Sequence, residues 1–372
     1  MKIYIADQII EIPIAEGAGI DIANNQLFNI VRMQMDLADE DYEKSFWSFI
    51  EEWVNEKDYV IAHTSGSTGL PKEIQINKTS MILSARRTNA FFQLNADMHA
   101  LLCMDCKYIG AKLMVIRALI GNLDLYITSP KTEPLLNFLH HFEGKIDFAA
   151  MVPYQLHHIA IDNIESLSRI DKLIIGGGSL PKALSDFIIA SGLKTVIYET
   201  YGMTETISHI AIREMTDVYF NALPEVEISI DERGCAQIED QLTQKGQIIQ
   251  TNDIIELHEP NQFKILGRLD NIINTGGVKI SPEIVEEKIK HLMPYQFLIS
   301  SMPDAVLGNK MILIYELNKK DDVIAEKIKP LLSSYEMPKE FIRVDHLIYL
   351  ENLKIDRIKS RQYVLENLGS SH

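Results

Sequence analysis

The chain has 372 residues, 46% of them hydrophobic, and carries a formal net charge of −16. This length and apolar content predict a large core and two domains. The acidic balance argues against a surface for nucleic acid or an anionic membrane. No apolar run is long enough to span a bilayer, and the first residues meet a charge too early for a secretory signal. We therefore expect a soluble cytoplasmic protein.

A helical apolar stripe in the first part of the chain predicts a helix at residues 41–54. From residue 59 to residue 198, strand-like and helical stretches alternate, which predicts a largely parallel sheet covered by helices. After a first strand at 58–62, strands are expected at 101–104, 123–127 and 173–175, and helices at 112–119 and 181–191.

Beyond residue 226 the pattern becomes that of short strands. A strand at 226–230 and a turn at 231–234 begin an antiparallel, barrel-like subdomain. A small α+β domain is expected after Asp270, with a helix at 282–291 capped by Ser281. It continues with a strand at 311–317 and a helix at 321–332. The predicted fold class is α/β, and the predicted domains are 1–269 and 270–372.

The three cysteines are Cys103, Cys106 and Cys235. The first two have CxxC spacing, but no second pair completes a zinc site and no thioredoxin-like context surrounds them. We interpret them as reduced thiols at the end of a strand.

A loop rich in hydroxyl groups follows the strand at 58–62. Glycines let backbone N–H groups approach an anion, hydroxyls donate further hydrogen bonds, and a lysine adds positive charge. The spacing differs from that of a Walker A loop. The pattern predicts a polyphosphate-binding loop, and the alternative is a Ser/Gly surface turn. Its candidate ligands are Thr64, Ser65, Gly66, Ser67, Thr68, Gly69 and Lys72.

Further motifs follow in order at residues 201–206, 251–253, 267–270 and 354–357. With the phosphate loop, this set resembles the acyl-adenylate-forming superfamily of acyl-CoA synthetases, luciferases and peptide-synthetase adenylation domains. The resemblance runs from about residue 58 to residue 357. It implies a large N-terminal adenylating domain that binds AMP and the acyl group, and a small mobile C-terminal domain. It also implies a reaction in which a carboxylate attacks the α-phosphate of ATP and pyrophosphate leaves.

The resemblance implies roles in holding ATP. The loop would bind the β- and γ-phosphates, Thr204 the α-phosphate, and Glu205 a Mg²⁺ ion, which favours a carboxylate oxygen beside substrate phosphates. Taken alone, the run containing these residues could be an ordinary turn between a strand and a helix. By the same resemblance Tyr201 would stack on adenine, Gly202 and Met203 would belong to the AMP site, and Asp253 and Arg268 would contact the ribose. Gly176, Gly177 and Gly178 follow a strand and would let the backbone approach the adenine edge; the alternative is a flexible turn before a helix capped by Ser179.

The C-terminal domain would contribute three features by the same resemblance. Asp270 matches the hinge about which this domain rotates between half-reactions. Lys354 matches the lysine that reaches the carboxylate and the α-phosphate. Gly276 and Gly277 would let the pantetheine arm of CoA pass, and a simple turn is the alternative.

The chain departs from the family pattern at several points. Only 62 residues precede His63, so the N-terminal domain is expected to be shortened. Asn252 stands where a glycine is usual, and asparagine is the residue that best replaces glycine at positive φ. Leu353 also replaces a glycine directly before Lys354, which makes Lys359 a second candidate.

Two clues concern the acid. The motif at 267–271, the glycines after it and the runs at 202–206 and 151–156 are similar to those of the 2-succinylbenzoate–CoA ligases of menaquinone biosynthesis, and other acyl-CoA ligases share parts of them. Such a substrate keeps one carboxylate while the other is activated, so its pocket should hold a cation. The candidates are Lys107, Lys112 and Arg117, with His209 lining the acyl end. Solvated charges on a helix are the alternative for the three cations, and a partly buried, hydrogen-bonded histidine for His209.

The resulting hypothesis is an AMP-forming acid–thiol ligase that uses ATP, Mg²⁺ and CoA and makes 2-succinylbenzoyl-CoA. One alternative is a ligase for another aryl or short-chain acid, or for a carrier-protein thiol. A second is a member that binds nucleotide without catalysis. The expected partners are small molecules, with self-association of the chain as an alternative, and neither nucleic acid nor a membrane span is expected.

Overall fold

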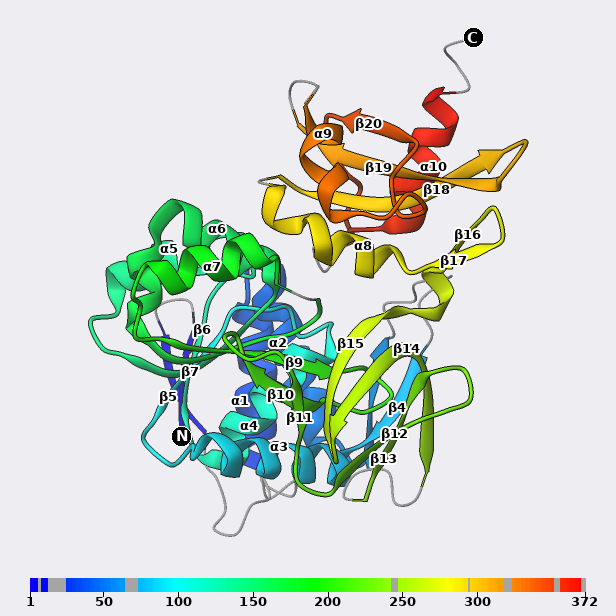
Figure 1. Cartoon of the computed structure of the whole chain (residues 1–372). Helices are drawn as coiled ribbons and strands as arrows, with labels where there is room; N and C mark the ends of the chain where they lie inside the picture. The colour runs from blue at the N-terminus through cyan, green and yellow to red at the C-terminus, as the bar shows by residue number, and fades with distance from the viewer. Residues whose placement is uncertain are drawn as a thin grey trace. The chain divides into compact units, whose positions relative to one another are not determined.

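The computed structural model describes residues 1–5, 8–12, 25–63, 73–178, 180–241, 247–293, 295–317, 323–350 and 355–368 (Figure 1). The chain divides into two compact units. Unit 1 comprises residues 1–179, 191–227 and 239–249, and unit 2 comprises residues 180–190, 228–238 and 250–372. The domain boundary expected at residues 269 and 270 stays a prediction.

Unit 1 is built on a sheet with parallel strands at its centre. The neighbour order is β11-β10-β9-β8-β7-β5-β6-β1-β2. Neighbours from β9 to β1 run parallel, whereas β2, β10 and β11 pair antiparallel with theirs. The predicted parallel sheet is therefore confirmed. The strands are β1 (Lys2–Ile5), β2 (Gln8–Glu11), β5 (His99–Leu102), β6 (Asp124–Ile127), β7 (Ile146–Met151), β8 (Ile170–Ile175), β9 (Val196–Gly202), β10 (His209–Glu214) and β11 (Phe220–Ala222).

Helices lie on both faces of this sheet (Figure 1). The reversal of strand order after β6 places α5 and α6 on the face opposite α4, since parallel crossovers are right-handed. Helix α4 packs against α3 and is buried from Ala111 to Leu119. The helices of unit 1 are α1 (Asn25–Leu37), α2 (Asp41–Val54), α3 (Lys78–Phe92), α4 (Ile109–Gly121), α5 (Pro134–His141), α6 (Pro153–Asn163) and the 3₁₀ turn η1 (Ile164–Arg169).

The helix predicted at residues 41–54 is confirmed as α2, and its apolar stripe is buried. Helix α3 begins at Asn77, whose side-chain oxygen accepts hydrogen bonds from the backbone N–H groups of Thr79 and Ser80, as an N-cap should. Before α3, the antiparallel strands β3 (Tyr59–His63) and β4 (Glu73–Asn77) flank residues 64–72.

Unit 2 holds residues from four strands that are neighbours in the order β12-β13-β14-β15. These are β12 (Val226–Ile230), β13 (Cys235–Asp240), β14 (Ile248–Glu259) and β15 (Gln262–Arg268), and unit 2 also contains α7 (Lys182–Ala190). The strand and the turn expected at residues 226–234 are confirmed. A 3₁₀ turn, η2 (Leu269–Asn271), and the antiparallel pair β16 (Ile273–Thr275) and β17 (Val278–Ile280) follow.

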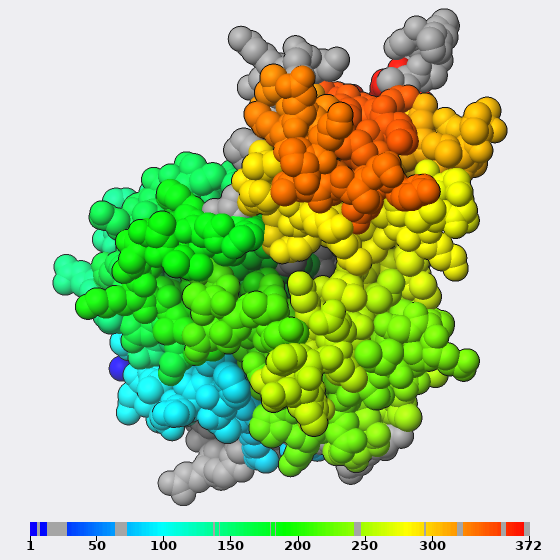
Figure 2. All heavy atoms as spheres, viewed as in Figure 1, coloured from blue at the N-terminus to red at the C-terminus, as the bar shows by residue number. Residues whose placement is uncertain are grey.

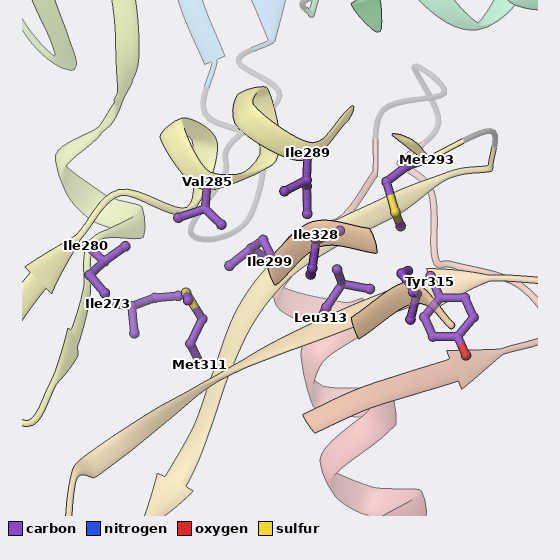
Figure 3. Close-up of a cluster of buried hydrophobic side chains, with 11 residues drawn as sticks. Ile273, Ile280, Val285, Ile289, Met293, Ile299, Met311, Leu313, Tyr315 and Ile328 are labelled. Carbon is purple, nitrogen blue, oxygen red and sulfur yellow. The ribbon is translucent and has the colours of Figure 1, made fainter. Parts of the chain in front are cut away.

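The last part of unit 2 is a small α+β fold. A sheet of β18, β19 and β20 packs α8 and α9 on one face, where Ile299, Met311, Leu313 and Tyr315 meet Val285 and Ile328 (Figure 3). On the other face of this sheet, the strand residues Leu298, Ile312 and Ile314 pack with Val364 of α10. The bounds are α8 (Pro282–Ile289), η3 (Lys290–Leu292), β18 (Phe297–Asp304), β19 (Gly308–Glu316), α9 (Ile324–Ile328), η4 (Lys329–Leu331), β20 (Glu340–Val344) and α10 (Arg357–Leu368). The stretch from α9 to β20, orange in Figure 2, reaches the surface of the unit.

The helix expected at 282–291, with Ser281 at its N-cap, is confirmed as α8 and η3. Ser281 makes no capping hydrogen bond, because its hydroxyl donates toward the Glu283 carboxylate at 3.0 Å, with the Leu266 carbonyl oxygen 3.3 Å away. One local prediction needs correction. The helix expected at 321–332 is shorter, since within the described residues it is α9 and η4. The cysteines are free and buried, and burial raises the pKa of Cys103 to about 12, which suits inert thiols.

Candidate active site

Two segments that are predicted to contact the nucleotide lie at the ends of neighbouring strands of the parallel sheet. Gly176, Gly177 and Gly178 come directly after β8, and Tyr201 and Gly202 end β9. Strands β8 and β9 pair in parallel, so both segments lie at the carboxyl edge of the sheet. A Cβ on Gly176 would lie 3.2 Å from the Thr200 hydroxyl oxygen of β9. Open α/β sheets bind ligands at this edge.

A tight turn from Met203 to Ser208 joins β9 to β10. The buried Thr206 hydroxyl accepts a hydrogen bond from the backbone N–H of Met203 and lies 2.8 Å from the Ser208 carbonyl oxygen. Gly202 is required here, because a Cβ would collide with that carbonyl oxygen and lie 2.6 Å from the Cα of His209. Ile207 has a φ of 69°, a strained conformation for a β-branched residue. Such strain gathers at functional turns, where the surrounding structure holds it.

Thr204 and Glu205 lie in this turn, Thr204 partly buried and Glu205 exposed. Within the described ranges, no cluster of three or more His, Cys, Asp or Glu residues could hold a metal ion. A single exposed carboxylate still fits Mg²⁺ in a nucleotide site, since that ion keeps several waters and takes further oxygens from the phosphates. Tyr201 is mostly buried, with its ring centroid 6.2 Å from that of Phe220.

The same turn contacts a buried arginine. Arg117 on α4 is 2% exposed, and its Nη2 lies 2.7 Å from the Ser208 hydroxyl and 3.4 Å from Nδ1 of His209. On its other side, Nε2 of His209 lies 3.3 Å from the Thr88 hydroxyl of α3. Burial lowers the pKa of the Arg117 guanidinium to about 9, so it is charged at neutral pH. Burial, together with the nearby Arg117 and Arg87, holds the pKa of His209 well below its usual value.

The two lysines predicted with Arg117 have different surroundings. Lys112 is buried, and its ammonium lies 2.8 Å from a Glu52 carboxylate oxygen and 2.7 Å from the Ile61 carbonyl oxygen. Its charge is therefore already balanced within the protein. Lys107 has a side chain that is 66% exposed and lies 3.6 Å from Asp105. Neither lysine contacts the turn in the way that Arg117 does.

In unit 2 the predicted ribose contacts and the predicted hinge form one network. Arg268 donates to Asp253 at 3.0 Å and to Asp270 at 2.8 Å. Asn252, which replaces the usual glycine, donates to the other oxygen of Asp270 at 2.8 Å and accepts from Arg233 at 3.0 Å. Asn252, whose side chain a glycine would lack, thus contacts Asp270, the predicted hinge residue.

Gly276 and Gly277 form the two-residue turn between β16 and β17. Their φ values are 56° and 84°. Positive φ at both central residues is the condition of a tight hairpin turn that glycine meets without strain. This conformation accounts for both glycines, and a CoA role stays a prediction.

Several predicted residues lie outside the described part of the chain. They are the loop residues Thr64, Ser65, Gly66, Ser67, Thr68, Gly69 and Lys72, and Lys354 with Leu353 before it. The second lysine candidate, Lys359, is described. Its side chain is exposed and lies 3.5 Å from Asp356.

Sequence reasoning missed Thr88, Ser208 and Glu52, which hold Arg117, His209 and Lys112 in place. Thr88 stands in the middle of a helix without any motif, and its partner is 121 residues away. Ser208 directly precedes His209, close to the recognised motif, and could have been noted as a polar residue of the same turn.

Comparisons with known proteins identify the family of the chain. The profile of the AMP-binding enzyme family matches residues 22–248. The 2-succinylbenzoate–CoA ligase of Escherichia coli strain K12 is 24% identical over 318 residues, covering 81% of this chain and 68% of that protein. The enzyme of the same name from Lactococcus lactis is 25% identical, covering 81% and 70%.

Solved structures show the same fold. An acyl-CoA synthetase (AMP-forming)/AMP-acid ligase II-like protein from Dyadobacter fermentans is 31% identical with a TM-score of 0.57, covering 90% of this chain and 98% of that one. The o-succinylbenzoate coenzyme A synthetase from Bacillus subtilis, in complex with ATP and magnesium ion, is 20% identical with a TM-score of 0.68, covering 81% and 69%. Among the described helices, none is long and apolar enough to cross a membrane. The predicted α/β adenylating fold and the resemblance read from the motifs are confirmed, and the chain belongs to the AMP-binding enzyme family.

Proposed function

We propose that this protein activates 2-succinylbenzoate with ATP and transfers the acyl group to CoA. In the first step a carboxylate oxygen bonds to the α-phosphorus, and the bond to the leaving pyrophosphate breaks. In the second step the CoA sulfur attacks the acyl carbon and AMP leaves. Curated relatives with the name of this ligase align with 80–95% of the chain, which supports this choice of acid.

One observation carries the proposal. Arg117 is a buried cation without a carboxylate partner among the described residues, and it contacts the turn that holds Thr204 and Glu205. An unpaired buried charge is costly, so it is expected where a ligand neutralises it. A substrate carboxylate that is not activated would supply the opposite charge. Lys112 is already paired with Glu52 and Lys107 is exposed, so Arg117 is the favoured cation.

Catalysis in this scheme is mainly positioning and stabilisation of charge. Thr204 would donate a hydrogen bond to the α-phosphate, and Glu205 would hold Mg²⁺, which screens the phosphate charges when bound. The loop 64–72 would bind the outer phosphates. Tyr201 and the glycines at 176–178 would hold the adenine, and Asp253 and Arg268 the ribose.

The C-terminal residues would contribute to both half-reactions. Lys354 would bind the carboxylate and the α-phosphate during adenylation, and Asp270 would act as the hinge. Gly276 and Gly277 would admit the pantetheine arm of CoA. We propose that the enzyme acts in the cytoplasm, where ATP and CoA are available, and cell fractionation with activity measured in each fraction tests this.

The test is pyrophosphate release from ATP with 2-succinylbenzoate, benzoate and fatty acids, each with and without CoA. Release with 2-succinylbenzoate that continues to turn over when CoA is present is the expected result. Release with another acid but not with 2-succinylbenzoate would support adenylation as the reaction and contradict the proposed choice of acid. No release with any acid, while ATP still binds, would favour the non-catalytic alternative.

Two variants test the assigned residues. Lys354→Ala should lower acyl-AMP formation by about 10²–10³-fold while sparing thioester formation from supplied acyl-AMP. Equal loss of both steps would contradict that role. Arg117→Met should raise the KM for 2-succinylbenzoate far more than the KM for ATP, and Lys107→Ala is the matched control on an exposed cation.

A further inference from the structure

A chain of buried polar groups connects α3, α4 and the turn before β10. The Thr88 hydroxyl donates its only proton to the Ser84 carbonyl, at 3.1 Å. Its oxygen must therefore accept from His209, so the proton of that ring lies on Nε2. The other ring nitrogen, Nδ1, is then an acceptor for the Arg117 guanidinium. The geometry thus sets both the tautomer of His209 and the direction of each hydrogen bond.

Among the described residues, the groups that hold the Arg117 guanidinium are uncharged. Nη2 of the guanidinium bonds to the Ser208 hydroxyl and to neutral His209, while its Nε has no hydrogen-bond partner among the described residues. Arg87, one helix away, is different, because Asp240 binds both of its terminal nitrogens. A carboxylate partner would neutralise Arg117, whereas neutral partners fix its position and leave its charge available.

We infer that Thr88 and His209 are positioning residues that aim Arg117 at the second carboxylate of a dicarboxylic acid substrate. The inference deepens the proposed function and rests on it. Neither residue needs to touch the substrate. Thr88 holds the His209 ring by its Nε2–H, and the ring in turn fixes the guanidinium through Nδ1. Loss of the Thr88 hydroxyl would free the ring to rotate, and Arg117 would lose the anchor that His209 provides.

The experiment compares Thr88→Val, which removes the hydroxyl at constant shape, with Thr88→Ser, which keeps it. The substrates are 2-succinylbenzoate and the two analogues that each lack one carboxylate, 3-benzoylpropanoate and 2-butanoylbenzoate. Thr88→Val should raise the KM for 2-succinylbenzoate roughly tenfold, as for one lost hydrogen bond of about 1.4 kcal/mol. The KM for whichever analogue is turned over, and the KM for ATP, should stay unchanged. Thr88→Ser should behave like the wild-type enzyme.

A double-mutant cycle separates positioning from general damage. If Thr88 acts through Arg117, Thr88→Val should add nothing to the KM effect of Arg117→Met. Because KM does not depend on the fraction of folded enzyme, partial unfolding of a variant does not imitate the result. Should Thr88→Val not fold, His209→Leu, which has no acceptor for Arg117, should show the same selective rise.

Two results would overturn the inference while leaving the proposed function intact. One is an equal rise in KM for 2-succinylbenzoate and the monocarboxylate analogue in Thr88→Val. The other is a full additive effect in the double variant. A wild-type enzyme that activates only monocarboxylic acids would overturn both the inference and the proposed function.

Discussion

A buried ion pair in unit 1 allows a sharp test of the energetics. Arg87 on α3 and Asp240 on β13 form a bidentate pair, with distances of 3.0 and 2.9 Å and side chains that are 4% and 0% exposed. Asp240→Asn keeps the shape but leaves the guanidinium without its counter-charge. Breaking such a pair typically costs about 3–5 kcal/mol. For a unit of this size that corresponds to a fall in Tm of roughly 6–20 °C.

The assay measures the unfolding of the wild-type enzyme and of Asp240→Asn by heat and by urea, with circular dichroism as the signal. The control is Asp171→Asn, which breaks the 2.9 Å ion pair between the exposed side chains of Lys145 and Asp171 and should cost less than about 1 kcal/mol. An apolar double variant, Arg87→Met with Asp240→Leu, should recover most of the loss, since burial of two charges is itself costly. Equal effects of Asp240→Asn and Asp171→Asn would refute the reasoning.

Three further predictions concern the neighbourhood of the candidate site. Because the folded state holds the pKa of His209 well below that of the unfolded chain, stability is full above about pH 6.5 and should fall by about 1.4 kcal/mol per pH unit below it. Urea unfolding at pH 7.5 and pH 5.5 checks this, and a His209→Asn variant with an equal fall would contradict it. Gly202→Ala should lower stability by about 1–3 kcal/mol through overpacking against the backbone at Ser208 and lower pyrophosphate release; unchanged values of both would show that the turn can yield. Lys112→Met should lower Tm by leaving Glu52 unpaired, without the rise in substrate KM expected of Arg117→Met; a selective rise in that KM would return Lys112 to the substrate pocket.

The sequence predicted those elements whose signals are local. Helix α2 was located at both ends because its apolar residues repeat with helical spacing and become buried; they are Phe46, Trp47, Phe49, Ile50 and Trp53. Helix α4 was recognised only in part, at 112–119 rather than 109–121, because a helix that is apolar on all sides has no stripe to mark its ends. Ser281 was placed correctly at an N-cap, yet its hydroxyl donates to the Glu283 carboxylate rather than capping the helix.

The candidate site divides in the same way. The motif at 201–206 marked the turn after β9, and the family pattern assigned both Asp253 and Arg268 to the ribose, but the hydrogen bond between those two residues is a finding of the structure. The partners of Arg117 and Lys112 could not be read from the sequence. Their side chains meet Ser208, His209 and Glu52 only after folding, and the choice between a solvated and a buried lysine depends on a carboxylate 60 residues away.

The division of unit 1 into three separate stretches of sequence has a consequence for how the protein is made. Its third stretch, residues 239–249, supplies Asp240, and its second, residues 191–227, supplies His209. A nascent chain that ends near residue 179 contains α3 and α4 but neither of these partners. Arg87 on α3 then lacks Asp240, and Arg117 on α4 lacks His209. Unit 1 therefore completes its core only when residue 249 has left the ribosome. Until then the chain exposes apolar surface, so its yield in cells should depend on chaperones more than that of a protein with contiguous domains.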